Sequence, residues 1–339
     1  MRDAGVIINW YGTPCYCRCR HCLLKSSERL TTVPFERAEA IAEKFVRWRD
    51  ERDAAELCVE FAGGYSCELP WLARYLEFRA RHGTAFSPFV PMNGIRIRSE
   101  ADTHDLLLML KDADIMEVGL TFYGTGEMHD RWARRKGDVD YLLSVARAAA
   151  NSGMQRVETI FLREATLGDL PELLGVLDEI PGLKHRSLGP WDYRGRGKLL
   201  EEERIRAPDI NRLPDGIKCF VNVERYRSEG EWVSRVSAGD IPAKTQRWYL
   251  IAVWEDNVER LESADCGQLI EEMRDADDAF HRSIPPLREL AARYGDPRGD
   301  RLYALRDLEW KWTDAYLTEH PEIDATARFD DLTMCVLTR

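Results

Sequence analysis

Short apolar runs alternate with longer stretches of helical periodicity from residue 5 to about residue 193. This alternation predicts repeated βα units around a parallel sheet, because each strand is buried and each intervening helix needs only one apolar face. The predicted strands are Val6–Asn9, Leu57–Ala62, Ser87–Pro91, Met116–Phe122, Arg156–Phe161 and His185–Leu188. The predicted helices between them are Phe35–Arg52, Leu69–His82, Glu100–Lys111, Val139–Asn151 and Leu170–Ile180.

Six strands with crossover helices can close fully, curl into a partial barrel or lie flat as a doubly wound sheet, and periodicity does not choose among these. The unusual residues are more informative, because their segments all follow the C-terminal ends of predicted strands. That edge is where barrels and open α/β sheets build their sites. The segments are 11–22, 63–67, 93–94, 123–130 and 192–197.

The rhythm of the sequence changes near residue 200. Ser228 and Glu231 have the spacing of a helix capping box, Trp248–Trp254 is an apolar run, and helical patterns follow Asp265. We therefore divide the chain into a βα core over 1–198 and a mostly helical C-terminal region over 199–339.

Composition excludes several classes of protein. With 339 residues, 44% of them hydrophobic, the chain can bury a substantial core. Its formal charge of -11 argues against a nucleic-acid partner, because such affinity depends on clustered Lys and Arg. The N-terminus lacks the pattern of a signal peptide, and no apolar run is long enough for a membrane span. We expect a cytoplasmic protein with neither a nucleic-acid nor a membrane partner.

Four of the nine cysteines lie within eight residues, at positions 15, 17, 19 and 22. The spacing Cys15-x3-Cys19-x2-Cys22 lets three thiolates bind three corners of an iron-sulfur cube, which leaves the fourth iron open to another ligand. Cys17 is then a spectator. The alternative is a zinc site that uses all four cysteines, although zinc sites favour paired cysteines separated by a longer loop.

Three cysteines in this order, directly after a first strand, resemble the signature of the radical S-adenosylmethionine superfamily. The resemblance implies a 4Fe-4S cluster, S-adenosylmethionine as cofactor, and a partial (β/α)6 TIM-like barrel. It also implies reductive cleavage of that cofactor to a 5'-deoxyadenosyl radical, fed by an external one-electron donor of the flavodoxin or ferredoxin type.

The same resemblance suggests cofactor contacts. Gly63 and Gly64 match the glycine-rich turn that meets the methionyl amino group, but Tyr65 replaces the usual acidic residue and Glu68 is its only nearby substitute. The fourth strand and its loop match a family pattern of strand, glycine turn, His-Asp pair and basic residue. The further implied cofactor contacts are His21, Asn93, Thr121, Arg131 and Tyr193, with Arg131 suited to a carboxylate.

The sequence identifies no catalytic residue and gives limited information on the substrate. Cys219, Cys266 and Cys335 are too far apart for a second cluster, and no leader-peptide-binding domain precedes the first strand. We therefore expect a small polar metabolite, such as a sugar, nucleoside or other natural-product intermediate, to undergo dehydrogenation, epimerisation, elimination or decarboxylation. A ribosomally made peptide is the alternative substrate. A non-catalytic metal or electron-transfer protein is the alternative of another class. The C-terminal region is a possible substrate lid, and at most one of Trp310 and Trp312 can face the site.

Overall fold

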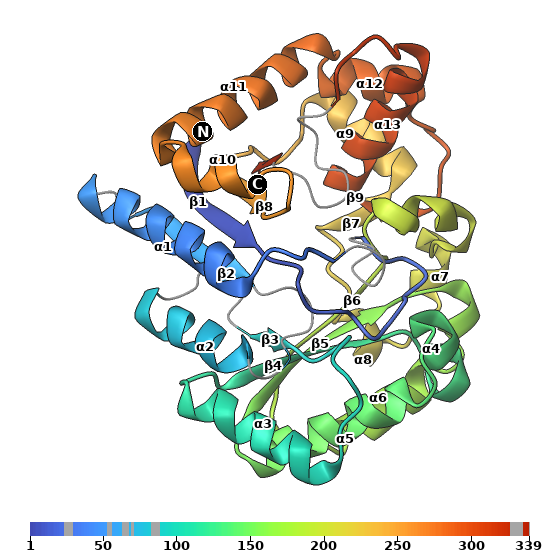
Figure 1. The fold of residues 1–339 in the computed structure, drawn as a ribbon. Helices are drawn as coiled ribbons and strands as arrows, with labels where there is room; N and C mark the ends of the chain where they lie inside the picture. The colour runs from blue at the N-terminus through green and yellow to red at the C-terminus, as the bar shows by residue number, and fades with distance from the viewer. Residues whose placement is uncertain are drawn as a thin grey trace.

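The computed structural model describes residues 1–23, 30–52, 56–62, 68, 71–82, 89–325 and 335–338. The predicted strands and helices of the core are present within these ranges, with ends shifted by a few residues (Figure 1). The strands are β1 (Arg2–Asn9), β2 (Cys58–Ala62), β3 (Val90–Pro91), β4 (Glu117–Phe122), β5 (Gln155–Phe161) and β6 (Leu183–Gly189). The main helices are α1 (Phe35–Glu51), α2 (Trp71–His82), α3 (Glu100–Asp112), α5 (Asp138–Asn151) and α6 (Leu170–Asp178), and the short α4 (Gly126–Ala133) follows β4.

The strands form two four-stranded sheets, ordered β10-β8-β1-β2 and β3-β4-β5-β6. All pairs within the second sheet are parallel, and β1 pairs in parallel with both β2 and β8. Only β10 (Cys335–Thr338) runs antiparallel to its neighbour among the described strands of these two sheets. The structure confirms the predicted α/β class and is consistent with a partial barrel.

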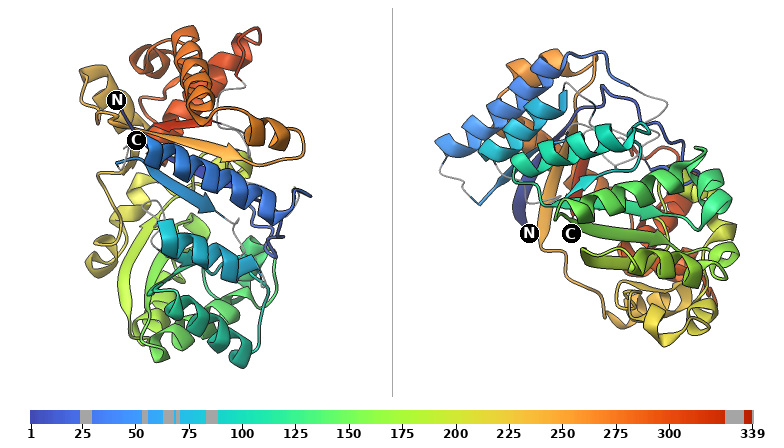
Figure 2. Two further views of the ribbon diagram at one scale, coloured as in Figure 1. Left: turned by 60° about the vertical axis from the view of Figure 1, so that its left-hand side comes forward. Right: turned by 90° about the horizontal axis from the view of Figure 1, so that it is seen from below.

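The C-terminal region contributes a strand to the first sheet. The apolar run noted in the sequence forms β8 (Gln246–Ala252), which lies beside β1 with Tyr249 opposite Val6 (Figure 2). The division of the chain at 198/199 remains a prediction, and β8 shows that residues on both sides of it build one sheet.

The rest of the C-terminal region is mostly helical. Ser228 and Glu231 form the predicted capping box at the start of α9 (Glu229–Ala238). A two-stranded ladder joins β7 (Tyr226–Ser228) to β9 (Leu302–Ala304). The helices and turns of this region also include η2 (Gly195–Glu203), α7 (Ala207–Asn211), α8 (Asp215–Lys218), α10 (Val258–Ser263), α11 (Cys266–Ser283), α12 (Leu287–Tyr294) and α13 (Leu305–Glu319).

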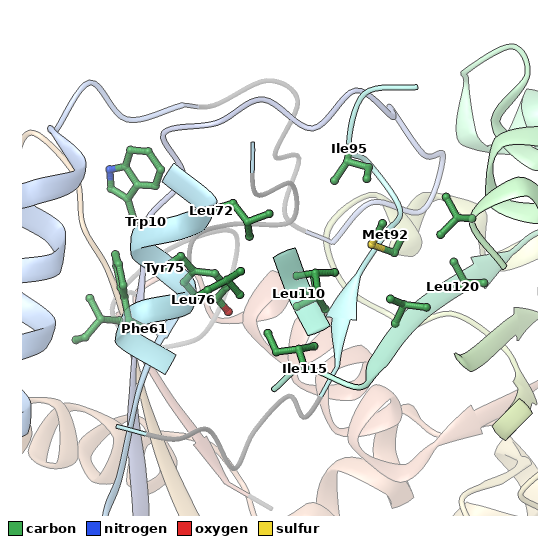
Figure 3. Close-up of a cluster of buried hydrophobic side chains, with 14 of the residues drawn as sticks. Trp10, Phe61, Leu72, Tyr75, Leu76, Met92, Ile95, Leu110, Ile115 and Leu120 are labelled. Atoms are coloured by element: carbon green, nitrogen blue, oxygen red, sulfur yellow. The ribbon is translucent and has the colours of Figure 1, made fainter. Parts of the chain in front are cut away.

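One buried hydrophobic cluster includes residues from both sheets. Figure 3 shows Phe61 and Leu76 on the side of the first sheet and Leu110 and Leu120 on the side of the second, all within one buried cluster. The same cluster includes Tyr249 from β8. A smaller cluster around Trp232 and Trp312 packs within the C-terminal region. Among the described residues, no helix combines the length and apolarity needed to cross a membrane.

Candidate functional site

The cysteine loop follows β1 and is fixed to three other loops by backbone hydrogen bonds. The Tyr16 amide donates to the Gly94 carbonyl oxygen after β3 at 2.8 Å, and the Arg18 amide donates to the Ala133 carbonyl oxygen at the end of α4 at 2.9 Å. After β6, the Arg196 amide donates to the Cys22 carbonyl oxygen at 3.3 Å. Tertiary contacts, as well as local turns, therefore define the conformation of this loop.

The three cysteines of the predicted cluster line one cavity of about 240 Å³. Gly94 makes room for the first of them: its φ is +83°, and a Cβ there would lie 2.5 Å from the Cys15 sulfur. Only glycine adopts this backbone without strain and leaves that space. The described residues that line the cavity are Cys15, Cys17, Cys19, His21, Cys22, Leu23, Pro91, Asn93, Gly94, Thr121, Tyr123, Phe161 and Asp192.

Cys17 also lines the cavity, and its thiol lies beside those of Cys15 and Cys19. Its side chain is buried, with the sulfur 3.7 Å from Oδ2 of Asp138, and it packs in a cluster with Tyr123 and Trp132. Cys15 and Cys19 are partly exposed and pack against this cluster. Cys17 therefore differs from these two cysteines in burial and in having a carboxylate neighbour.

Asn93 and Thr121 meet at the ends of β3 and β4. The Asn93 side-chain amide donates to the Thr121 carbonyl oxygen at 2.9 Å, and its oxygen accepts from the Thr121 amide at 2.7 Å. The Asn93 side chain thus uses both its amide nitrogen and its oxygen to continue the pairing of the two strands beyond Pro91, the last residue of β3. The structure brings both predicted residues to the cavity, with Asn93 holding the backbone beneath it.

His21 lies in an aromatic surround formed by Tyr123, Trp132 and Phe161. Its ring centroid is 4.7 Å from that of Phe161 and 5.1 Å from that of Tyr123. Trp132 Nε1 donates to His21 Nδ1 at 2.7 Å, so the ring proton is assigned to Nε2. Burial lowers the pKa of the His21 imidazole to about 3, despite the opposing charge of Asp192. At neutral pH His21 is therefore an uncharged ring.

The His-Asp pair after β4 has a structural role. His129 is fully buried, its Nδ1 accepts from the Tyr123 amide at 3.1 Å, and its Nε2 lies 3.0 Å from Asp138 Oδ2. Burial alone would raise the pKa of Asp138, but His129 and Arg135 outweigh it and keep the pKa low. Asp130 accepts from two backbone amides at the start of α5. His129 and Asp130 thus hold Tyr123, the residue after β4, against the start of α5.

Two predicted cofactor residues do not reach the cavity. The Arg131 side chain is 71% exposed and pairs with Glu127 at 2.7 Å, one helical turn away. Tyr193 packs against the C-terminal cluster, and its amide donates to Asp307 Oδ1 at 3.0 Å. The cofactor contacts predicted for these two side chains remain predictions. In each case the chain places the backbone near the site and directs the side chain elsewhere.

Most of the predicted glycine-rich turn lies outside the residues that the structure describes. Gly63 and Gly64 lie outside the described residues, as does Tyr65. Glu68 is described: it accepts from the Arg96 amide at 3.0 Å and pairs with Arg98 at 2.6 Å. Glu68 does not line the cavity, and its contacts are with the loop after β3.

Among the lining residues that the sequence did not single out are two aromatic residues and one acidic residue, Tyr123, Phe161 and Asp192. Each follows or ends a strand at the edge already expected to carry the site, and that position was the available signal. The Tyr123 hydroxyl lies 3.6 Å from the Cys19 sulfur, and burial, reinforced by Cys19, raises its pKa. Tyr123 and Phe161 stack with their ring centroids 5.8 Å apart.

Asp192 joins the cavity to the C-terminal region. Its Oδ2 lies 3.7 Å from Arg306, the second residue of α13, while Asp307 accepts from the neighbouring backbone. Trp310 of the same helix stacks on Arg194, with 3.8 Å between the guanidinium carbon and the ring centroid. Trp312 is fully buried and donates to Glu229. Of the two tryptophans, Trp310 is the one beside the loop after β6.

Cys15, Cys19 and Cys22 line one cavity, as the thiolates that hold an iron-sulfur cube would. Within the described ranges, no three His, Cys, Asp or Glu side chains converge closely enough to hold a single metal ion. A cube instead bonds each thiolate to a different iron and needs a cavity between separated sulfurs. Cys15, Cys19 and Cys22 border such a cavity, and Gly94 leaves space beside Cys15.

Comparisons with known proteins reveal similarity at the level of structure. No family model matches the chain, and no curated protein matches it. Streptococcus suis SuiB bound to S-adenosylmethionine aligns over 74% of this chain and 58% of its own, with a TM-score of 0.47 and 11% identity. The protein anSMEcpe with bound AdoMet and the Cp18Cys peptide aligns over 70% and 61%, with a TM-score of 0.41 and 13% identity.

A third similar structure is coproporphyrinogen III oxidase (HemN) from Escherichia coli, a radical SAM enzyme. It aligns over 64% of this chain and 50% of its own, with a TM-score of 0.39 and 14% identity. This chain thus spans less than two thirds of the length of each of the three proteins. Its structure is similar to structures that include a radical S-adenosylmethionine enzyme.

Proposed function

We propose that the chain is a radical S-adenosylmethionine enzyme that holds a 4Fe-4S cluster on Cys15, Cys19 and Cys22. The observation that carries the proposal is the placement of these thiols around one cavity at the C-terminal edge of parallel strands, with Gly94 leaving space beside Cys15. When bound, the cluster and S-adenosylmethionine supply a 5'-deoxyadenosyl radical that abstracts hydrogen from an unactivated C–H bond.

The residues that line the cavity would bind and orient a molecule there and exclude water from it. Tyr123, Phe161 and neutral His21 form an aromatic wall that limits water beside the thiols. Asp192 is the carboxylate among the described lining residues, so it offers an acceptor to a hydroxyl or ammonium group of a bound molecule. Asn93 holds the backbone at the ends of β3 and β4, which keeps Thr121 and Gly94 in register with the cysteine loop.

Two substrate classes are considered for the proposed enzyme. The wide separation of the cysteines beyond residue 200 favours a small polar metabolite, because peptide-modifying relatives usually hold extra clusters there. The second class is a ribosomally made peptide. SuiB and anSMEcpe have also been solved with peptides bound, so a peptide arm belongs in the screen.

The deciding experiment is anaerobic reconstitution with iron and sulfide, followed by dithionite and S-adenosylmethionine. We expect about four irons per chain, as a 4Fe-4S cube requires, and formation of 5'-deoxyadenosine measured by mass spectrometry. Cys22→Ala should abolish both signals, whereas Cys219→Ala, at an exposed cysteine outside the cavity, should retain both. A reconstituted wild-type protein that is reduced reversibly without forming 5'-deoxyadenosine would instead be the electron-transfer protein considered above.

A further inference from the structure

A basic surface with two exposed apolar side chains surrounds the cysteine loop. Tyr16, between Cys15 and Cys17, is 46% exposed, and Ile97 is 49% exposed. Exposed apolar side chains are typical of interaction sites where they lie together inside a polar or charged rim. The basic residues around them are Arg18, Arg96, Arg131, Arg134 and Lys136, and all five are exposed.

These residues belong to one face because the segments that carry them contact each other. The cysteine loop bonds to Gly94 and to Ala133 through the backbone. Arg135 donates to the Ile95 carbonyl oxygen, and a Cβ on Gly137 would lie 3.9 Å from the end of Ile97. The segments 15–20, 94–97 and 131–137 therefore adjoin one another, and we call their exposed residues the basic face.

Most of the positive charge on the basic face is not neutralised locally. No carboxylate of the described residues forms an ion pair with Arg18, Arg134 or Lys136, whereas Arg131 pairs with Glu127 and Arg96 pairs with Glu68. Asp138 is buried, Asp130 is used to cap α5, and the exposed Asp140 lies farther along that helix.

Such a face contrasts with the rest of the chain. The whole protein has a formal charge of -11, so its average field repels an acidic partner. Surface charges act over about one Debye length, roughly 8 to 10 Å in physiological salt. A local concentration of unpaired Arg and Lys can therefore attract and orient an acidic protein at this one place.

We propose that the basic face docks a small acidic one-electron carrier protein of the flavodoxin type. This inference rests on the proposed function, which requires one electron at the cysteine loop. Tyr16 adjoins Cys15 and Cys17 in the chain, and Cys15 and Cys19 are partly exposed, so a partner seated here lies beside the loop that carries the thiols. In the transfer, the reduced carrier loses one electron and the oxidised cluster gains it, and no bond is made or broken.

The test uses the reconstituted full-length protein and a purified acidic flavodoxin. The variant is Arg134→Glu with Lys136→Glu, because both side chains are exposed and unpaired. The matched control is Arg282→Glu with Arg288→Glu, two exposed and unpaired arginines at the C-terminal end of α11 and in α12. Both pairs change the net charge equally, so only position differs.

We expect the Arg134/Lys136 variant to bind flavodoxin about tenfold more weakly, and the cluster to be reduced about tenfold more slowly by reduced flavodoxin in stopped flow, as for a lost steering field. The control should match wild type, and reduction by dithionite should be the same in all three proteins. Equal binding by variant and control, or weaker binding with an unchanged reduction rate, would overturn the docking proposal.

Two further measurements keep the outcomes separate. Wild-type affinity for flavodoxin should fall steeply as salt increases, because the contact is between exposed charges. A flat salt response contradicts the proposal even if the variant fails to fold. If dithionite yields no 5'-deoxyadenosine from the wild type, the proposed function fails, whereas flavodoxin binding and cluster reduction still report on the basic face.

Discussion

The cavity has two walls that are built differently. The first wall consists of the cysteine loop, the loop after β3 and the end of β4, all from residues 15 to 138, and backbone hydrogen bonds join its parts. The second wall is the loop after β6, where Asp192 faces the cavity and its neighbours contact α13 of the C-terminal region. The first wall provides the thiols, and the second connects the cavity to the C-terminal region.

The two walls differ in how much of each can be predicted from the spacing of a sequence motif and how much depends on tertiary contacts. The thiols of the first wall come from one motif of residues a few positions apart, although the loop that carries them is also held by contacts to Gly94 and Ala133. The second wall depends on contacts such as that between Tyr193 and Asp307, which are 114 positions apart. We expect changes in the first wall to affect cluster binding and changes in the second to affect mainly stability.

The largest effect is expected from the first wall. Replacing Cys15, Cys19 or Cys22 singly by Ala should remove most of the bound iron, because each thiolate holds one corner of the cube. Cys17→Ala should retain the iron, since its buried sulfur points towards Asp138. Iron content and visible absorption after anaerobic reconstitution provide the measurement. Equal iron loss in the Cys17 variant would favour the four-cysteine site instead.

The next effect compares two glycines with the same backbone conformation. Gly94 has a φ of +83° and Gly153 a φ of +71°, so either change to Ala should cost about 1 to 2 kcal/mol in backbone strain. Only at Gly94 would the new Cβ lie 2.5 Å from the Cys15 sulfur, whereas nothing lies within 4 Å at Gly153. Gly94→Ala should therefore lose bound iron at a stability cost similar to that of Gly153→Ala. Matching iron contents in the two variants would mean that Cys15 can move aside.

The second wall is expected to respond to pH. Burial, with the charge of Asp192, raises the pKa of Asp307 to about 6 from its ordinary value of 3.8. The folded protein then binds a proton more tightly than the unfolded chain, so the free energy of unfolding should fall by about 3 kcal/mol as pH rises from about 4 to about 6.

Asp307→Asn should remove this contribution while keeping an oxygen for the Tyr193 amide. The measurement is the difference in free energy of unfolding between wild type and variant across that pH range, by denaturant titration. Asp215→Asn, at an almost fully exposed carboxylate, serves as the matched surface control. A wild-type-minus-variant difference that does not change with pH would show that Asp307 is ionised throughout.

The smallest effect is expected at Arg131, which the family resemblance had assigned to the cofactor. Its exposed pair with Glu127 contributes about 0.3 to 0.5 kcal/mol, so Arg131→Ala should barely change stability or S-adenosylmethionine affinity. Arg163→Ala should lower both stability and S-adenosylmethionine affinity more than Arg131→Ala does. The reason is that this buried arginine donates to the Tyr123 carbonyl oxygen at 2.8 Å and lies over Trp132. Isothermal titration of S-adenosylmethionine into the reconstituted variants measures cofactor affinity, and denaturant titration measures stability. A marked loss of cofactor affinity on removing Arg131 would restore its predicted role.

The sequence predicted the order of strands and helices in the core well, because buried strands and amphipathic helices leave distinct periodicities. It also placed Cys15, Cys19, Cys22, His21 and Thr121 at one edge. It could not place β8, since an isolated apolar run does not reveal which strand it joins. Nor could it orient Arg131 and Tyr193, because a motif fixes the position of a backbone but not which neighbour the side chain meets.

The pairing of β1 with β8 has a consequence for how the protein is made. β1 ends just before the cysteine loop, yet one of its two neighbours in the sheet is not synthesised until about residue 252. Contacts this distant in sequence form late in folding. During translation, the thiols therefore emerge from the ribosome long before the sheet that positions them is complete. Metal insertion is then expected to follow release of a nearly full-length chain, and premature termination upstream of β8 should yield chains that cannot retain iron.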